Sequence, residues 1–169
     1  MITISQIKKA FMLLYSGILD KNISKQMWFN HYKEKDLLPC IRLYLLGYFQ
    51  NNFEPEKSTS HPYSYSGEGR FDFLIGDVAV EFAVRTPECS SRKLKLCDNT
   101  DEIAKLTKYP GDAVLILFDF SKNILAASDL EQYNQLPSLG RGVKRYPLSI
   151  LYYYKDNQGT FKALRKNIK

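Results

Sequence analysis

The 169 residues fit a single domain, since domains commonly contain about 100 to 200 residues. Apolar residues make up 44% of the chain and aromatic residues 14%, which supplies a core and excludes the poorly hydrophobic, highly charged class of disordered proteins. No apolar run approaches the roughly 18 residues that indicate a transmembrane helix. We therefore expect one domain over residues 1–169 that does not enter a membrane.

The net charge of +6 is distributed unevenly along the chain. Residues 1–140 contain 16 Lys and Arg against 17 Asp and Glu, whereas residues 141–169 contain 8 against 1. A segment this basic can neutralise phosphates and release their counterions, although a solubilising surface explains it equally well. Within it, Arg141, Lys144 and Arg145 are candidate contacts to a nucleic-acid backbone.

The three cysteines (Cys40, Cys89 and Cys97) are widely separated and form no C-x-x-C pair. This pattern favours neither a disulfide framework nor a zinc site, and it is typical of reduced thiols in a cytoplasmic protein. With only two histidines, a histidine-based metal cluster is not expected either. No glycine-rich phosphate-binding motif is present, so we expect no nucleotide cofactor.

The first 52 residues are expected to be helical. Residues 4–18 have amphipathic helical spacing, and a second helical stretch is expected from about Ser24. A third helix is predicted to start with Asp36 as its N-cap, because Pro39 then falls in the first turn, where a missing N–H costs little. The buried stripe of this third helix is predicted to contain four residues: Leu38, Ile41, Leu45 and Tyr48.

A polar stretch rich in Ser, Pro and Gly follows at residues 54–69. Its composition predicts a connecting loop, with a short edge strand as the alternative. Two period-2 runs then follow: Phe71, Phe73 and Ile75 alternate with Arg70, Asp72 and Leu74, and Val78, Val80, Phe82 and Val84 alternate with Ala79, Glu81, Ala83 and Arg85. Because Gly76 and Asp77 separate the two runs, the pattern predicts a β-hairpin that turns at this step.

The remaining elements complete an α/β pattern. Residues 99–109 read as a helix, and the continuous apolar run 113–120 is typical of a strand buried on both faces. A short helix is expected near 128–135, and two final strands near 148–154 and 159–164. This order predicts a mixed central sheet with helices on both of its faces.

The hairpin brings two carboxylates together. A turn at Gly76-Asp77 pairs residues whose numbers sum to about 153, so Asp72 is expected opposite Glu81, with their Cβ atoms roughly 5 Å apart. Like charges placed in this way destabilise a sheet unless something compensates them. A divalent cation such as Mg²⁺ is one compensation, and a nearby arginine, Arg70 or Arg85, is the other.

The segment from Asp72 to Ala83 resembles the core of the PD-(D/E)xK nuclease superfamily, which has the restriction-endonuclease-like fold. In that family an Asp ends one hairpin strand, an Asp/Glu-x-Lys tripeptide lies on the next, and a helix and a buried strand follow. The resemblance extends over about residues 34–120. It implies that Asp72 and Glu81 bind Mg²⁺ or Mn²⁺. Glu34 is a further candidate metal ligand, because it is a weaker match to an acidic residue that some members carry at the start of the preceding helix.

The sequence departs from the family at the lysine, because position 83 is Ala83. The family lysine positions the attacking water and stabilises developing negative charge. Some members supply this cation from elsewhere, often from the following helix. By the resemblance, four lysines are candidates for the missing group: Lys93, Lys95, Lys105 and Lys108. Arg85, on the strand face of Glu81, is a candidate phosphate contact, but a guanidinium cannot act as a base.

Two functions follow from this pattern. The first is a metal-dependent endonuclease that hydrolyses phosphodiester bonds in nucleic acid, with DNA favoured over RNA. A divalent cation held by Asp72 and Glu81 would lower the pKa of a water molecule and screen the charge that builds on the phosphate. The second is a catalytically inactive module of the same fold that binds nucleic acid, a protein partner or a second copy of itself. Ala83 favours the module, and the carboxylate pair favours the enzyme.

Overall fold

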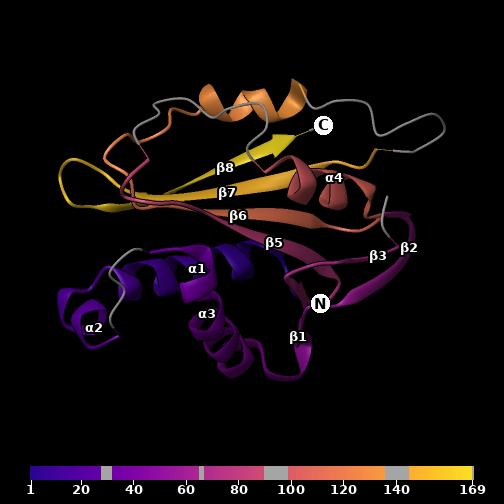
Figure 1. The fold of residues 1–169 in the computed structure, drawn as a ribbon, viewed down its shortest axis with the longest axis horizontal. Helices are drawn as coiled ribbons and strands as arrows, with labels where there is room; N and C mark the ends of the chain where they lie inside the picture. Colours follow the sequence, from indigo (N-terminus) through magenta and orange to yellow (C-terminus); the bar gives the residue numbers. More distant parts are fainter. Residues whose placement is uncertain (28–31, 65–66, 90–98, 136–144, 169) are drawn as a thin grey trace.

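The fold was obtained as a computed structural model, which describes residues 1–27, 32–64, 67–89, 99–135 and 145–168, with no side-chain description for 59–68. The chain forms an α/β structure built on a mixed six-stranded sheet (Figure 1). Among the described residues, no helix has the length and apolar character needed to cross a membrane.

The central sheet has the strand order β1-β4-β5-β6-β7-β8. Strands β5, β6 and β7 run parallel to one another, and the remaining neighbours are antiparallel. The strand bounds are as follows: β1 Phe53–Pro55, β4 Phe73–Ile75, β5 Val78–Arg85, β6 Ala113–Asp119, β7 Leu148–Lys155 and β8 Phe161–Ile168. The predicted hairpin and the predicted buried strand are therefore confirmed as neighbours in one sheet.

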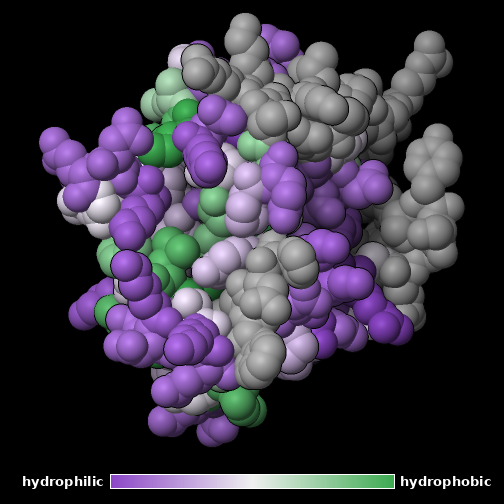
Figure 2. Space-filling model, turned by 60° about the vertical axis from the view of Figure 1, so that its left-hand side comes forward, coloured by the Kyte–Doolittle hydropathy of each residue, from purple (hydrophilic) through white to green (hydrophobic). Residues whose placement is uncertain are grey.

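Helices cover both faces of this sheet (Figure 1). On one face lie the N-terminal helices α1 (Ile4–Ile18), α2 (Lys21–Gln26) and α3 (Glu34–Phe49), the last followed by the 3-10 turn η1 (Gln50–Asn52). On the other face lie α4 (Thr100–Lys108) and the 3-10 helix η2 (Asp129–Gln135). The end of the molecule that contains α2 presents mainly hydrophilic side chains around a smaller apolar area (Figure 2).

The alternation along β5 divides its side chains between two apolar clusters. Val80 and Phe82 pack with the N-terminal helices, whereas Ala79 and Ala83 pack with α4. Every residue of β6 is buried, as expected for a strand covered on both faces. The turn between β4 and β5 uses Gly76 with a φ of 59°, the positive angle that a two-residue hairpin turn needs at its first central position.

The N-terminal helices differ in part from the prediction. Helix α1 has the predicted bounds, and a capping box between Thr3 and Gln6 stabilises its start. Helix α2 begins at Lys21, earlier than predicted, because the carboxylate of Asp20 accepts hydrogen bonds from the N–H groups of Asn22 and Ile23. Residues 28–31 of the predicted second helix lie outside the described residues.

The predicted start of the third helix was wrong. Helix α3 begins at Glu34 with Lys33 as its N-cap, so Pro39 lies inside the helix instead of in its first turn. The buried stripe is therefore displaced: Leu37 replaces Leu38, and Phe49 replaces Tyr48. The burial of this apolar stripe against the sheet offsets the backbone hydrogen bond that Pro39 removes.

The loop predicted over residues 54–69 is largely strand. Strand β1 adds to the edge of the central sheet, and β2 (Ser58–Ser64) and β3 (Gly67–Arg70) form a separate antiparallel pair with an irregular register. The polar composition of residues 54–69 did not predict this pair of strands, because a two-stranded ribbon outside the main sheet has no face that must be apolar. The predicted helix at 99–109 and the predicted strands at 113–120 and 148–154 agree with the structure to within one residue at each end, and the turn at Asp156–Gly159 lies between β7 and β8. The last strand was predicted over 159–164 but covers Phe161–Ile168, and the short helix expected near 128–135 is the 3-10 helix η2.

Candidate active site

The β4–β5 hairpin positions both predicted carboxylates. Its register pairs Phe73 with Val80, so one further step places Asp72 opposite Glu81, as the sequence predicted. Asp72 directly precedes β4, and its Oδ2 atom accepts a hydrogen bond of 2.8 Å from the Phe82 N–H. This bond orients one carboxylate oxygen by the backbone and leaves the other for a ligand.

Glu81 is the most deeply placed carboxylate of the site. Its side chain lies on the α4 side of β5 and only 1% of it is exposed. Ala79 and Ala83, on the same strand face, are buried against Ile103 and Leu106 of α4. The small side chains on both sides of Glu81 therefore let the helix pack closely over it.

Lys105 of α4 reaches this buried carboxylate. Its Nζ atom lies 2.6 Å from Glu81 Oε1 and donates a hydrogen bond of 3.1 Å to the carbonyl oxygen of Arg70. The approach to Glu81 is an ion pair without hydrogen-bond geometry, so Oε1 is a buried oxygen with no hydrogen bond among the described residues. The lysine is 34% exposed, which leaves its ammonium open to a ligand as well.

The structure describes two of the four candidate lysines. Lys105 is in the site, and Lys108 lies one helical turn further on, at the end of α4. Lys93 and Lys95 lie outside the described residues. A cation does come from the helix that follows the hairpin, although position 83 carries none.

The electrostatics of the site are dominated by crowded negative charge. Burial, followed by the charges of Asp72 and Glu102, raises the pKa of Glu81 to about 9, and Lys105 opposes the shift. The pKa of Glu34 rises to about 7, because of partial desolvation and then the charges of Asp72 and Glu102. Glu34 is exposed as a whole residue, which agrees with its smaller shift.

Glu102 was not predicted from the sequence. It precedes Lys105 by three residues on α4, and this spacing places both side chains on one side of the helix. The i, i+3 pair of opposite charges was the available signal, but such pairs are common on exposed helices. Only the packing of α4 over β5 brings Glu102 near the other carboxylates.

The acidic side chains suit a cation held by two protein carboxylates. Mg²⁺ typically takes one or two carboxylates and completes its coordination with water. The buried, unsatisfied oxygen of Glu81 and the uncommitted oxygen of Asp72 fit that requirement, provided that Lys105 yields its contact. Within the described ranges, no three His, Cys, Asp or Glu residues are arranged to hold one metal, so Glu34 does not complete a three-ligand set with this pair.

Arg85, which the sequence predicted as a phosphate contact, is buried in the structure. Its side chain is 7% exposed and forms a buried ion pair with Asp119, and it also donates to the Asn123 carbonyl. The hydroxyl of Tyr152 donates to the same Asp119 oxygen at 2.5 Å. The guanidinium therefore belongs to a buried network at the end of β5, and it does not neutralise the Asp72–Glu81 pair.

The basic C-terminal segment is only partly available to a ligand. Lys166 pairs with Glu131 at 2.7 Å, and Lys162 lies 3.8 Å from Asp156. Arg145 precedes β7, whereas Arg141 and Lys144 lie outside the described residues. The positive charge of the strand β8 is thus partly used within the protein.

Comparisons with known proteins found no relative whose site could be compared with this one. No protein-family model matches the sequence, and no significant match was found among curated proteins or among solved structures.

Proposed function

We propose that this chain is a metal-dependent nuclease that hydrolyses phosphodiester bonds in nucleic acid, with DNA favoured. The observation that carries the proposal is the 2.6 Å contact between Lys105 Nζ and Glu81 Oε1. It places a lysine beside the carboxylate pair even though position 83 is alanine. Asp72 and Glu81 are the proposed metal ligands, and Lys105 is the proposed catalytic cation.

The order of the elements supports a restriction-endonuclease-like fold. Helix α3 is followed by the antiparallel strands β1, β4 and β5, then by α4, and then by β6 parallel to β5. Asp72 stands at the start of β4, and Glu81 lies in the middle of β5. This arrangement agrees with the family pattern of an Asp and a Glu on adjacent hairpin strands, followed by a helix and a buried strand.

Each proposed residue has a separate task. The Phe82 N–H holds the Asp72 carboxylate in one orientation, and burial holds Glu81 beside it. A lysine ammonium has three donors, and one of those of Lys105 bonds the Arg70 carbonyl while the charge lies 2.6 Å from Glu81 Oε1, so a donor is left for a phosphate oxygen or an attacking water. A bound divalent cation would supply the lowered pKa of a water molecule and the screening of phosphate charge.

The test is a cleavage assay on supercoiled plasmid, single-stranded DNA and RNA with Mg²⁺ or Mn²⁺. We expect cleavage by the wild type and none by Glu81→Gln or Lys105→Met. Lys108→Met is the matched control, because it removes a lysine from the same helix without touching Glu81, and it should stay active. Equal loss in Lys105→Met and Lys108→Met would contradict a specific role for Lys105.

A second candidate function is a binding module that has lost catalysis. It is favoured by Ala83 and by the absence of a three-ligand metal group among the described residues. In that case the wild type cleaves no substrate under any metal condition. The second protein to assay is Ala83→Lys in a Lys105→Ala background, which restores a lysine on the strand. If both proteins are folded and inactive, the nuclease proposal fails and the module remains.

A further inference from the structure

Arg70 is an exposed cation next to the candidate site. It ends β3, two residues before Asp72, which corresponds to roughly 7 Å along an extended backbone. In the part of the chain that the structure describes, no ion pair or hydrogen bond engages its guanidinium. Its carbonyl oxygen accepts the hydrogen bond from Lys105 Nζ, so its backbone is tied to the proposed catalytic lysine.

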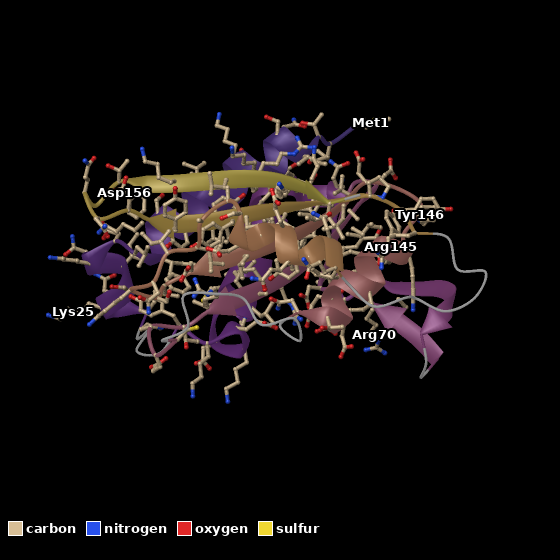
Figure 3. All side chains as sticks on the ribbon, turned by 90° about the horizontal axis from the view of Figure 1, so that it is seen from above. Met1, Lys25, Arg70, Arg145, Tyr146 and Asp156 are labelled. Carbon is tan, nitrogen blue, oxygen red and sulfur yellow. The ribbon has the colours of Figure 1, made fainter. Side chains whose placement is uncertain are left out.

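Arg145 lies beside the same helix, although it is distant in the sequence. The neighbouring Tyr146 N–H donates a hydrogen bond of 2.7 Å to the Thr107 carbonyl in the last turn of α4. Figure 3 shows Arg70, Arg145 and Tyr146 at one end of the long axis of the molecule, with Lys25 at the opposite end. Two arginines from separate segments therefore lie at the end of the molecule that contains α4.

The site needs such cations for an anionic substrate. The charges of Asp72 and Glu102, which raise the pKa of Glu34 and of Glu81, also repel a phosphate group. Arginine binds phosphate oxygens through a planar fork of donors, which makes it well suited to hold a backbone against this repulsion. Lys162 and Lys166 of β8 face Asp156 and Glu131.

We infer that Arg70 and Arg145 are phosphate contacts that hold a nucleic-acid strand across the end of α4. The inference rests on the proposed function and names the surface that receives its substrate. It assigns a binding role to Arg70 and joins it to Arg145, which the sequence had already given as a candidate contact, at the end of the molecule that contains α4.

The test measures binding without cleavage. Affinity for a short DNA duplex and for a single strand is determined over about 50 to 200 mM salt, once with a chelator and once with Ca²⁺. We expect Arg70→Gln and Arg145→Gln each to weaken binding about tenfold. Each should also lower the slope of log K against log salt by about 0.9 on duplex or about 0.7 on single-stranded DNA. Lys25→Gln makes the same change in net charge at the opposite end and should leave both quantities unchanged.

Several outcomes overturn the inference. The inference fails if the slope of log K against log salt is unchanged in Arg70→Gln and Arg145→Gln. It also fails if Lys25→Gln changes affinity and slope as much as the arginine variants do, or if the wild type binds no nucleic acid in either buffer. Failure here is distinguishable from failure of the proposed function. If the wild type cleaves nucleic acid but neither arginine variant changes the salt slope, only the proposed binding surface is contradicted. If binding depends on the arginines but no cleavage occurs, only the proposed catalysis is contradicted.

Discussion

The ammonium of Lys105 lies 2.6 Å from Oε1 of Glu81, although the two residues belong to different elements, α4 and β5. Glu81 is nearly inaccessible to water, and Asp72 is its neighbour across the hairpin, so the charge of Lys105 is the main compensation that the described protein offers. The same contact supplies the cation that Ala83 lacks. Stability and catalysis therefore both depend on this one contact, and both can be tested by changing its two residues.

Moving the lysine back to the strand should rescue the site. Lys105→Ala is expected to reduce cleavage about 100-fold or more, as for other preorganised groups that stabilise transition-state charge. Adding Ala83→Lys should restore part of the activity, because the new side chain starts on the strand face of Glu81 and the removed lysine leaves it space. Plasmid nicking rates measure the effect, with circular dichroism to check folding. Full activity in Lys105→Ala would show that another group acts.

The raised pKa of Glu81 makes stability depend on pH in a defined direction. The folded state holds a proton on Glu81 up to about pH 9, whereas the unfolded chain loses it near its ordinary value of 4.5. Between these values the folded state binds more protons, so stability falls as pH rises, by at most about 1.4 kcal/mol per pH unit for this one group. Glu81→Gln should remove this contribution and become the more stable protein at pH 8. Parallel Tm–pH curves for both proteins would contradict the assignment.

Metal ions should stabilise the protein most at alkaline pH. A divalent cation binds the ionised form of Glu81, so binding must displace a proton and becomes tighter as pH rises. We expect Mn²⁺ or Mg²⁺ to raise Tm more at pH 8 than at pH 6 in thermal-shift measurements. Asp72→Asn should abolish most of the shift. A metal effect of the same size in Asp72→Asn would place the ion elsewhere.

Two substitutions of Asp72 should separate charge repulsion from hydrogen bonding. Asp72→Asn removes the negative charge beside Glu81 and keeps an acceptor for the Phe82 N–H, so the variant should be more stable than wild type without metal. Asp72→Ala also removes the charge, but it leaves that N–H unpaired at a cost of about 1–3 kcal/mol. In urea denaturation at pH 8, Asp72→Asn should therefore have a higher free energy of unfolding than Asp72→Ala. The reverse order would mean that the hydrogen bond is unimportant.

Arg85 and Asp119 should behave as structural residues. Asp119→Ala leaves the buried guanidinium of Arg85 without its partner and removes an acceptor from Tyr152, so a loss of about 3–5 kcal/mol is expected. Lys162→Met breaks an exposed pair and serves as the control, with an expected loss below about 1 kcal/mol. The free energy of unfolding in urea measures both. A small effect of Asp119→Ala, with binding of nucleic acid lost in Arg85→Gln, would return Arg85 to the binding surface.

The sequence by itself determined the hairpin and the pairing of Asp72 with Glu81. Two alternating runs and a glycine at the turn set the strand register through contacts between residues close in the chain, and a shift by one residue would bury the wrong face. The amphipathic first helix and the continuous apolar run of β6 were readable for the same reason. In each case the pattern of apolar residues within one short segment was enough to predict the element.

Only the tertiary structure decided which residues meet at that pair. Lys105 and Lys108, the two candidate lysines that the structure describes, were equivalent until the burial of Ile103 and Leu106 fixed the rotation of α4. That rotation turned Lys105 and Glu102 towards β5. Arg85 looked available until the parallel pairing of β5 with β6 placed it opposite Asp119. Arg70 was recognised as a neighbour of the site only from the hydrogen bond that its carbonyl oxygen accepts from Lys105. These contacts join segments far apart in the chain, so their partners depend on how whole elements pack and not on any local pattern.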